Sequence, residues 1–261
     1  MSVAGVLFDL EGVLLRAKTH EVLPYANDVL EFCREKQLPF GIITNNTVQR
    51  PESILRILNE RDLGIAEAQL LTPLKFLRQE LNQTETALVI GSDNLRQFVT
   101  ELGVKVLETP DVDVVICGGS YSISNELLYS AFSAIFQSNS RFVCLHRNRV
   151  CNDATGITRP DVGCIVVGLE YSTGVQAKTI GKPSVDYFNH ATFCWNIEAK
   201  NILLISDDPI SDLGGAKKIG FQTGFVCTGK YGIDIHDKLE TKPDMTWPTL
   251  EGALSDLATI T

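Results

Sequence analysis

The N-terminal segment combines an apolar stretch with an abrupt acidic ending. Residues 3–8 are apolar or glycine, and Asp9 and Glu11 follow with one leucine between them. A short apolar run beside glycine predicts a strand buried on both faces, as in a parallel sheet. Ligands of such sheets bind outside the carboxyl ends of the strands, where Asp9 and Glu11 would emerge. Because two adjacent carboxylates repel, the pair indicates a cation, a shared proton or catalysis; solvated acids at a strand end are the alternative.

The chain then alternates between helical and strand patterns. Apolar positions at helical spacing predict a helix within residues 21–37, followed by a strand over residues 38–43 and a helix from Pro51 to Asn59. Strand, helix, strand and helix in this order indicate a right-handed parallel unit. Thr44, directly after the second strand, would therefore lie beside Asp9 if the two strands are neighbours.

The middle of the chain carries a second alternating unit. Residues 161–167 in it fit either a strand or the start of a buried helix. We expect an inserted α/β domain over residues 79–177 and a discontinuous core formed by residues 1–78 and 178–261. The other expected elements of the insertion are strands at 86–90, 112–117 and 141–145 and helices at 95–102 and 124–136.

The opening pattern returns near the C-terminus. The apolar residues 202–205 predict a strand, and Ser206, Asp207 and Asp208 follow it. A helix is expected to begin at Asp212. The last predicted elements are a strand over residues 221–227 and a short helix over residues 250–257.

Charge and cysteine usage narrow the class of protein. The formal net charge of −9 argues against a nucleic-acid-binding face, although a small site can be locally positive and bind phosphate. There is no apolar run of membrane-spanning length and no secretion signal. The 7 cysteines are scattered without a C-x-x-C pair, which is typical of a reducing compartment. We expect a cytoplasmic protein that binds neither nucleic acid nor membrane.

Four groups of polar residues stand at the expected ends of strands or in loops. Acids hold a hard cation such as Mg²⁺ through oxygen, while a hydroxyl and an ammonium bind phosphate oxygens. A carboxylate can also attack phosphorus and form an aspartyl-phosphate. The residues therefore indicate phosphoryl chemistry on magnesium. The four groups are Asp9 with Glu11, Thr44 with Asn45, Lys182 between Gly181 and Pro183, and Asp207 with Asp212.

The order and spacing of these groups resemble the haloacid dehalogenase (HAD) superfamily, and more narrowly its subclass IIA of NagD-like and 4-nitrophenylphosphatase-like hydrolases. The resemblance implies an α/β fold, a HAD-like Rossmannoid core with a parallel sheet and an α/β cap domain inserted between the second and third motifs. It also implies Mg²⁺ as cofactor. The matching segments are residues 9–14, Thr44-Asn45-Asn46, Gly181-Lys182-Pro183 and residues 206–212.

The resemblance also implies a role for each matching residue. Asp9 would be the nucleophile and a magnesium ligand, with the Glu11 carbonyl and Asp207 as the other protein ligands. Asp212, with help from Asp208, would steer metal-bound water from behind. The residues that would grip the phosphoryl oxygens are Thr44, Asn45 and Lys182, and Lys182 would also neutralise charge on Asp9.

Two positions depart from the family pattern. Phosphatases of the family carry Asp where this chain has Glu11, and that acid protonates the leaving group and later activates water. The side chain of Glu11 is longer by one methylene, about 1.5 Å, and a displacement of about 1 Å can cost on the order of a hundredfold in rate. Ser206 replaces a glycine. The resemblance therefore implies a slow or specialised phosphatase, or a site where Glu11 works by local adjustment. The alternative is a non-catalytic, regulatory protein that binds phosphates on the same scaffold.

The insertion would select the substrate, which we expect to be a small phosphorylated metabolite. Arg147 and Arg149 are candidates for contact with an anionic substrate, although a solvated loop arginine is the more common case. Family members commonly associate through the cap, so a homodimer is expected. A dinucleotide-binding enzyme needs G-x-G-x-x-G and a P-loop protein needs G-x-x-x-x-G-K-[ST]; the chain has neither.

Overall fold

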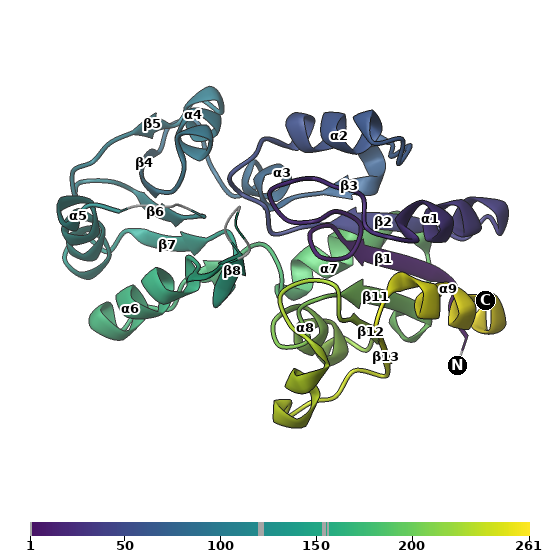
Figure 1. Ribbon diagram of the computed structural model, residues 1–261. Coiled ribbons are helices and arrows are strands. Elements are labelled where there is room, and N and C mark those ends of the chain that lie inside the picture. The colour runs from purple at the N-terminus through teal and green to yellow at the C-terminus, as the bar shows by residue number, and fades with distance from the viewer. Residues whose placement is uncertain (1, 120–122, 153–154, 156) are drawn as a thin grey trace.

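Two parallel β-sheets lie side by side in the computed structural model, each covered by helices (Figure 1). The structure describes residues 2–119, 123–152, 155 and 157–261. Among the described residues, no helix is long and apolar enough to cross a membrane. The architecture confirms the expected α/β fold with parallel sheets and an inserted cap.

The larger sheet is formed by strands from both the N-terminal and the C-terminal part of the sequence. Its six strands are all parallel, in the order β13-β12-β11-β1-β2-β3. The central strand β1 therefore has β11 and β2 as neighbours, although these strands come from opposite ends of the sequence. The six strands are β1 (Gly5–Asp9), β2 (Phe40–Ile43), β3 (Leu70–Leu71), β11 (Ile202–Ser206), β12 (Gln222–Val226) and β13 (Met245–Trp247).

Helices cover both faces of this sheet because its strands are apolar on both sides. Val6 and Phe8 pack in one cluster with residues of α1, α2 and α9, whereas Leu7 packs in another with residues of α3, α7 and α8. The helices are α1 (Ala26–Glu35), α2 (Pro51–Glu60), α3 (Pro73–Leu77), α7 (Val185–Thr192), α8 (Asp212–Lys218) and α9 (Leu250–Ile260).

The smaller sheet forms the cap. It has the order β10-β7-β6-β4-β5 and is also parallel, and an antiparallel hairpin of β8 and β9 is separate from it. Residues of α4 pack on one face, and those of α5 and α6 on the other. The elements are β4 (Thr86–Ile90), α4 (Asp93–Glu101), β5 (Lys105–Val106), β6 (Val114–Cys117), α5 (Asn125–Phe136), β7 (Arg141–Cys144), β8 (Val150–Asn152), β9 (Thr158–Pro160), α6 (Gly163–Thr173) and β10 (Lys178–Thr179).

The cap and core share one apolar cluster. Leu74 and Leu77 of α3 belong to a cluster that contains Leu7 of the core sheet and Val89 of the cap sheet. The cap sheet also extends past residue 177, because β10 pairs with β7. Continuous packing of this kind holds the cap over the carboxyl ends of the core strands.

Some element boundaries differ from the ranges that the sequence pattern indicated. The helix expected within residues 21–37 begins only at Ala26, because the preceding segment forms an antiparallel bridge between Leu15 and Val22. The ambiguous residues 161–167 begin the helix α6 at Gly163 rather than a strand. The sequence pattern did not indicate the short strands β3, β5 and β10, since two-residue strands leave no periodicity to detect.

Candidate active site

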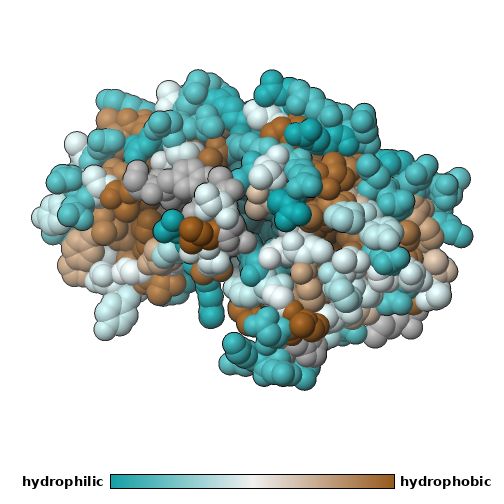
Figure 2. Space-filling view, viewed as in Figure 1, coloured by the Kyte–Doolittle hydropathy of each residue, from teal (hydrophilic) through white to brown (hydrophobic). Residues whose placement is uncertain are grey.

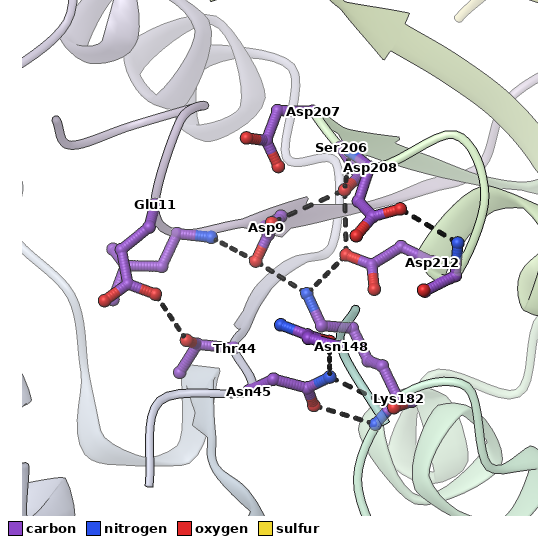
Figure 3. A network of polar contacts seen from close by, with 12 residues as sticks. Asp9, Glu11, Thr44, Asn45, Asn148, Lys182, Ser206, Asp207, Asp208 and Asp212 are labelled. Carbon is purple, nitrogen blue, oxygen red and sulfur yellow. Dashed lines mark hydrogen bonds and ion pairs between the residues drawn. The ribbon is translucent and has the colours of Figure 1, made fainter. Parts of the chain in front are cut away.

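Three neighbouring strands end at the same edge of the core sheet and bring their polar residues together. Asp9 is the last residue of β1, Thr44 follows β2, and Asp207 follows β11. The register pairs Asp9 with Ile43 and Phe8 with Ile205, which aligns the three strand ends. Figure 3 shows their side chains and Lys182 arranged around one space.

Asp9 is held by a buried ion-pair network. Its Oδ1 accepts hydrogen bonds from Lys182 Nζ at 2.6 Å and from the Leu10 amide at 2.8 Å. Lys182 Nζ also contacts Asp212 Oδ2 at 2.6 Å, so one ammonium connects two carboxylates. Burial raises the pKa of Asp9 to about 6, although Lys182 opposes the shift. Burial lowers the pKa of Lys182, but Asp212 and Asp9 outweigh it and raise this pKa above its usual range.

Ser206 joins this network from the end of β11. Its hydroxyl donates to Asp212 Oδ2 at 2.8 Å, lies 3.4 Å from Asp9 Oδ2, and accepts the Asp208 amide at 3.1 Å. The serine that replaces the family glycine therefore connects Asp9 with Asp212. Its side chain is fully buried.

Asn45 connects the core to Lys182 and to the cap. Its Oδ1 accepts the Lys182 amide at 2.9 Å, and its Nδ2 donates to the Lys182 carbonyl and to Asn148 Oδ1, both at 3.0 Å. Asn148 lies in the cap loop after β7 and is buried. Figure 3 shows it directly beside Asn45 and Lys182. Asn45, which the sequence analysis expects to bind phosphate, therefore also contacts the cap through Asn148.

Glu11 lies on the other side of Asp9, where it contacts the loop after β2. Its Oε2 accepts from Thr44 Oγ1 at 3.3 Å, and its Oε1 accepts from Asn46 Nδ2 at 2.8 Å. The extra methylene thus carries the carboxylate to two donors of the Thr44-Asn45-Asn46 segment.

Asp207 has one satisfied and one orphaned carboxylate oxygen. Oδ2 accepts the Lys230 amide at 2.6 Å, whereas the buried Oδ1 has no hydrogen-bond partner among the described residues. Burial raises the pKa of Asp207 to about 8. Gly12, with φ +86°, and Gly229 pack so closely against this carboxylate that a Cβ on either would collide with it. An orphaned anionic oxygen in a buried site calls for a cation.

The residues fit a magnesium ion. Mg²⁺ is bound by few carboxylates and keeps several waters, so two acids and a carbonyl suffice. Among the residues described by the structure, no cluster of three or more His, Cys, Asp or Glu side chains suits a metal. As the resemblance implies, the cation would be held by Asp9, by Asp207 with its orphaned Oδ1, and by the backbone carbonyl of Glu11.

Lys230 is a site residue that the sequence analysis missed. Its Nζ lies 3.4 Å from Asp208 Oδ2, and its side chain is only 16% exposed. Burial lowers its pKa, but Asp207 and Asp208 are the largest of the opposing contributions, and the pKa rises well above its usual range. Asp208 Oδ1 meanwhile accepts the amides of Ile210 and Ser211, which fixes the turn into α8. Its segment, Thr228-Gly229-Lys230, lacks the P-loop spacing and matches no other motif, so the sequence pattern gave no indication of its role.

A cavity of about 900 Å³ opens above these acids, between core and cap. Figure 2 shows the surface hollowed at the same junction. The cap contributes His146 and Asn148 to its wall. Arg147 does not: it forms a two-fold ion pair with Glu170 inside the cap, with both distances 2.6 Å. Of the two candidate arginines, Arg147 therefore stabilises the cap, and Arg149 is exposed and does not line this cavity.

Comparison with known proteins identifies the type of hydrolase. A family model described as haloacid dehalogenase-like hydrolase matches residues 6–105, and a second, HAD-hydrolase-like model matches residues 179–253. Phospholysine phosphohistidine inorganic pyrophosphate phosphatase from Mus musculus is 28% identical over 250 residues, 91% of this chain and 88% of the relative. Haloacid dehalogenase-like hydrolase domain-containing protein 2 from Homo sapiens is 26% identical over 259 residues, 98% of this chain and 96% of the relative.

Solved structures share the fold over nearly the whole chain. A p-nitrophenyl phosphatase from Archaeoglobus fulgidus superposes with a TM-score of 0.85 at 21% identity, covering 98% of this chain and 100% of that one. NagD from E. coli K-12 gives a TM-score of 0.77 at 20% identity, covering 96% of this chain and 98% of that one. The two family models together match about two thirds of the chain, on both sides of the cap. The chain belongs to the haloacid dehalogenase-like hydrolases.

Proposed function

We propose that this protein is a Mg²⁺-dependent phosphatase that hydrolyses a small phosphate monoester through an aspartyl-phosphate on Asp9. One observation carries the proposal. The Asp9 carboxylate lines the cavity, where Lys182 Nζ lies 2.6 Å from one of its oxygens and Glu11, Asn45 and Asp207 line the same wall. The groups proposed as nucleophile, ammonium cation and proton donor line one wall of the cavity, which supports the proposal. Several similar proteins carry phosphatase names, which supports the reaction class.

The first half-reaction transfers the phosphoryl group to the protein. A carboxylate oxygen of Asp9 forms a bond to phosphorus while the bond from phosphorus to the leaving oxygen breaks. Glu11 gives its proton to that leaving oxygen, so the substrate departs as a neutral alcohol. Thr44 and Lys182 offset the charge on the phosphoryl oxygens, which is the main catalytic contribution in phosphoryl transfer.

The second half-reaction returns Asp9 to its starting state. Water attacks phosphorus, its proton passes to Glu11, and the bond between phosphorus and Asp9 breaks to release inorganic phosphate. Lys182 stays within reach of Asp9 and Asp212 throughout, and it therefore stabilises the carboxylate that leaves. A bound Mg²⁺ would supply further positive charge to the phosphoryl oxygens.

The first test is hydrolysis of p-nitrophenyl phosphate with and without Mg²⁺. We expect activity that requires Mg²⁺ and that falls at least about a thousandfold in Asp9→Asn, because the amide cannot act as nucleophile. Asp186→Asn serves as the matched control, since Asp186 lies in the first turn of α7 and outside the cavity. Equal activity in Asp9→Asn and the natural chain would refute the mechanism.

One observation favours a second candidate function, phosphate binding without turnover. The Thr44 hydroxyl, expected to grip the phosphoryl group, donates instead to Glu11. If this contact persists, Glu11 competes with the substrate for the hydroxyl. A natural chain that is inactive but becomes active in Glu11→Asp would establish the binding protein and identify Glu11 as the defect.

A further inference from the structure

Asn46 is fixed by the backbone beside Glu11. Its Oδ1 accepts the amides of Val48 and Gln49 at 3.1 and 2.9 Å. These contacts decide which way the side-chain amide faces, because only the oxygen can accept from backbone N–H groups. The Nδ2 group is therefore left to donate to Glu11 and to the Gln49 side chain. The orientation of Asn46 is set independently of Glu11.

The two hydrogens of Asn46 Nδ2 have two acceptors. One is Glu11 Oε1 at 2.8 Å and the other is Gln49 Oε1 at 2.9 Å. The Glu11 carboxylate accepts two hydrogen bonds. The one from Asn46, at 2.8 Å, is shorter than the one from Thr44 Oγ1 to the other oxygen, at 3.3 Å. Thr44 is also the residue expected to turn toward a phosphoryl group. Asn46 is then the contact that remains when substrate is bound.

We propose that Asn46 is the positioning residue of Glu11. The proposal rests on the function proposed above. A glutamate has one more rotatable bond than an aspartate, so its carboxylate needs an additional anchor to stay at a defined place. A donor fixed by the backbone supplies that anchor. An aspartate, shorter by about 1.5 Å, would hold its carboxylate that much farther from Asn46.

Dependence on the leaving group tests this role. Nitrophenolate is a weak base and leaves without a proton, whereas the benzyl alkoxide is a strong base and needs one. In Asn46→Ala we expect kcat/KM for benzyl phosphate, which reports phosphoryl transfer to Asp9, to fall about thirtyfold, within the range for a misplaced catalytic group. We expect kcat/KM for p-nitrophenyl phosphate to change less than about threefold. Slower attack of water would lower kcat for both substrates alike, because Glu11 serves both steps.

A double-mutant cycle shows whether Asn46 acts through Glu11. Glu11→Gln removes the transferable proton, so adding Asn46→Ala to it should cost no further activity toward benzyl phosphate. Asn46→Asp guards against loss of the fold, because it keeps the acceptor for the Val48 and Gln49 amides but has no donor for Glu11. It should show the same selective loss for benzyl phosphate.

Asn59 provides the matched control. It also clamps a turn, with its Oδ1 accepting the Ile65 amide at 2.9 Å and its Nδ2 donating to the Ile65 carbonyl at 3.1 Å. Asn59→Ala should affect both substrates equally. Equal losses of kcat/KM for both substrates in Asn46→Ala, or additive losses in the cycle, would overturn the proposal while the phosphatase function stands. A natural chain that hydrolyses neither substrate would overturn both.

Discussion

Asp9 and Asp207 are buried acids whose pKa values burial raises to about 6 and about 8. A cation that binds both must find them ionised, and binding therefore releases protons. We expect the affinity for Mg²⁺, measured by calorimetry, to rise between pH 6 and pH 8 by roughly tenfold for each pH unit below the higher pKa.

The affinity for Mg²⁺ rises with pH because the pKa values of Asp9 and Asp207 are both raised. Protonation competes with the cation below each raised pKa, so acid weakens binding and base restores it. Asp207→Asn removes the group with the higher pKa and should weaken binding and flatten the pH dependence together. An affinity that stays constant from pH 6 to pH 8 would contradict the assignment of Asp207 as a ligand.

Lys230 adds positive charge to the acid cluster at Asp208, whereas Lys182 contacts Asp9 and Asp212. Replacing one partner of a buried, charged contact leaves the other unpaired, so Lys230→Met should lower the free energy of unfolding by about 2 kcal/mol. Mg²⁺ should recover part of this loss. Urea unfolding with and without Mg²⁺ measures both effects.

The control for Lys230 is an exposed lysine with a similar partner. Lys217 contacts Asp244 at 2.9 Å, and its side chain is 36% exposed. Lys217→Met should cost less than about 1 kcal/mol and should not respond to Mg²⁺. Equal losses in the two variants would mean that Lys230 has no special relation to the acids.

Single residues at strand ends could be predicted because each stands in a motif of its own. Once the parallel order of the strands is known, these residues are expected to lie close together, as Figure 3 shows for Asp9, Thr44, Lys182 and Asp207. Lys230 could not be predicted in the same way, since its place depends on the path of the loop after β12. The contact between Glu11 and Asn46 could not be predicted from the sequence either, because it depends on a side-chain rotamer.

At the scale of elements, α7 supports the loop that carries Thr44. Tyr187 of α7 is fully buried, and its hydroxyl lies 2.8 Å from the Thr44 carbonyl and 2.9 Å from the Leu71 carbonyl. Tyr187→Phe should lower the free energy of unfolding by about 1–2 kcal/mol, because the Thr44 carbonyl loses its donor, while the Leu71 carbonyl keeps the Thr44 amide. Tyr171→Phe, at 91% exposure, should leave it unchanged in the same urea titration.

A stability equal to that of the natural chain in Tyr187→Phe would show that α7 does not hold the Thr44 loop.

The long apolar strands and the helix at Pro51 matched their sequence patterns closely. The elements between residues 145 and 180 did not, because a short hairpin and an edge strand are stabilised by contacts with the rest of the cap rather than by their own periodicity.

At the scale of the molecule, the outer face of the cap exposes large apolar side chains. Residues of α5 and α6 account for five of them, and Figure 2 shows brown surface over part of the cap. This face supports the proposed homodimer through the cap. The five residues are Leu128, Tyr129, Phe136, Val167 and Tyr171.

Light scattering at defined protein concentration tests the dimer. Val167→Asp combined with Tyr171→Asp should convert a dimer to a monomer, because burying two unpaired charges at an interface is costly. Phe193→Asp is the control. Phe193 is 84% exposed but lies in the catalytic-core domain rather than in the cap, so its replacement should leave the measured mass unchanged. A natural chain that is monomeric at all concentrations would contradict the cap interface.

The most direct test of the account is detection of a phosphoryl group on Asp9. We expect that acid quenching during turnover, borohydride reduction and peptide mass spectrometry will find residue 9 converted to homoserine in the natural chain with Mg²⁺ and substrate, and unmodified without substrate. An active enzyme with residue 9 unmodified, and the reduced residue at another acid or at none, would contradict Asp9 as the nucleophile.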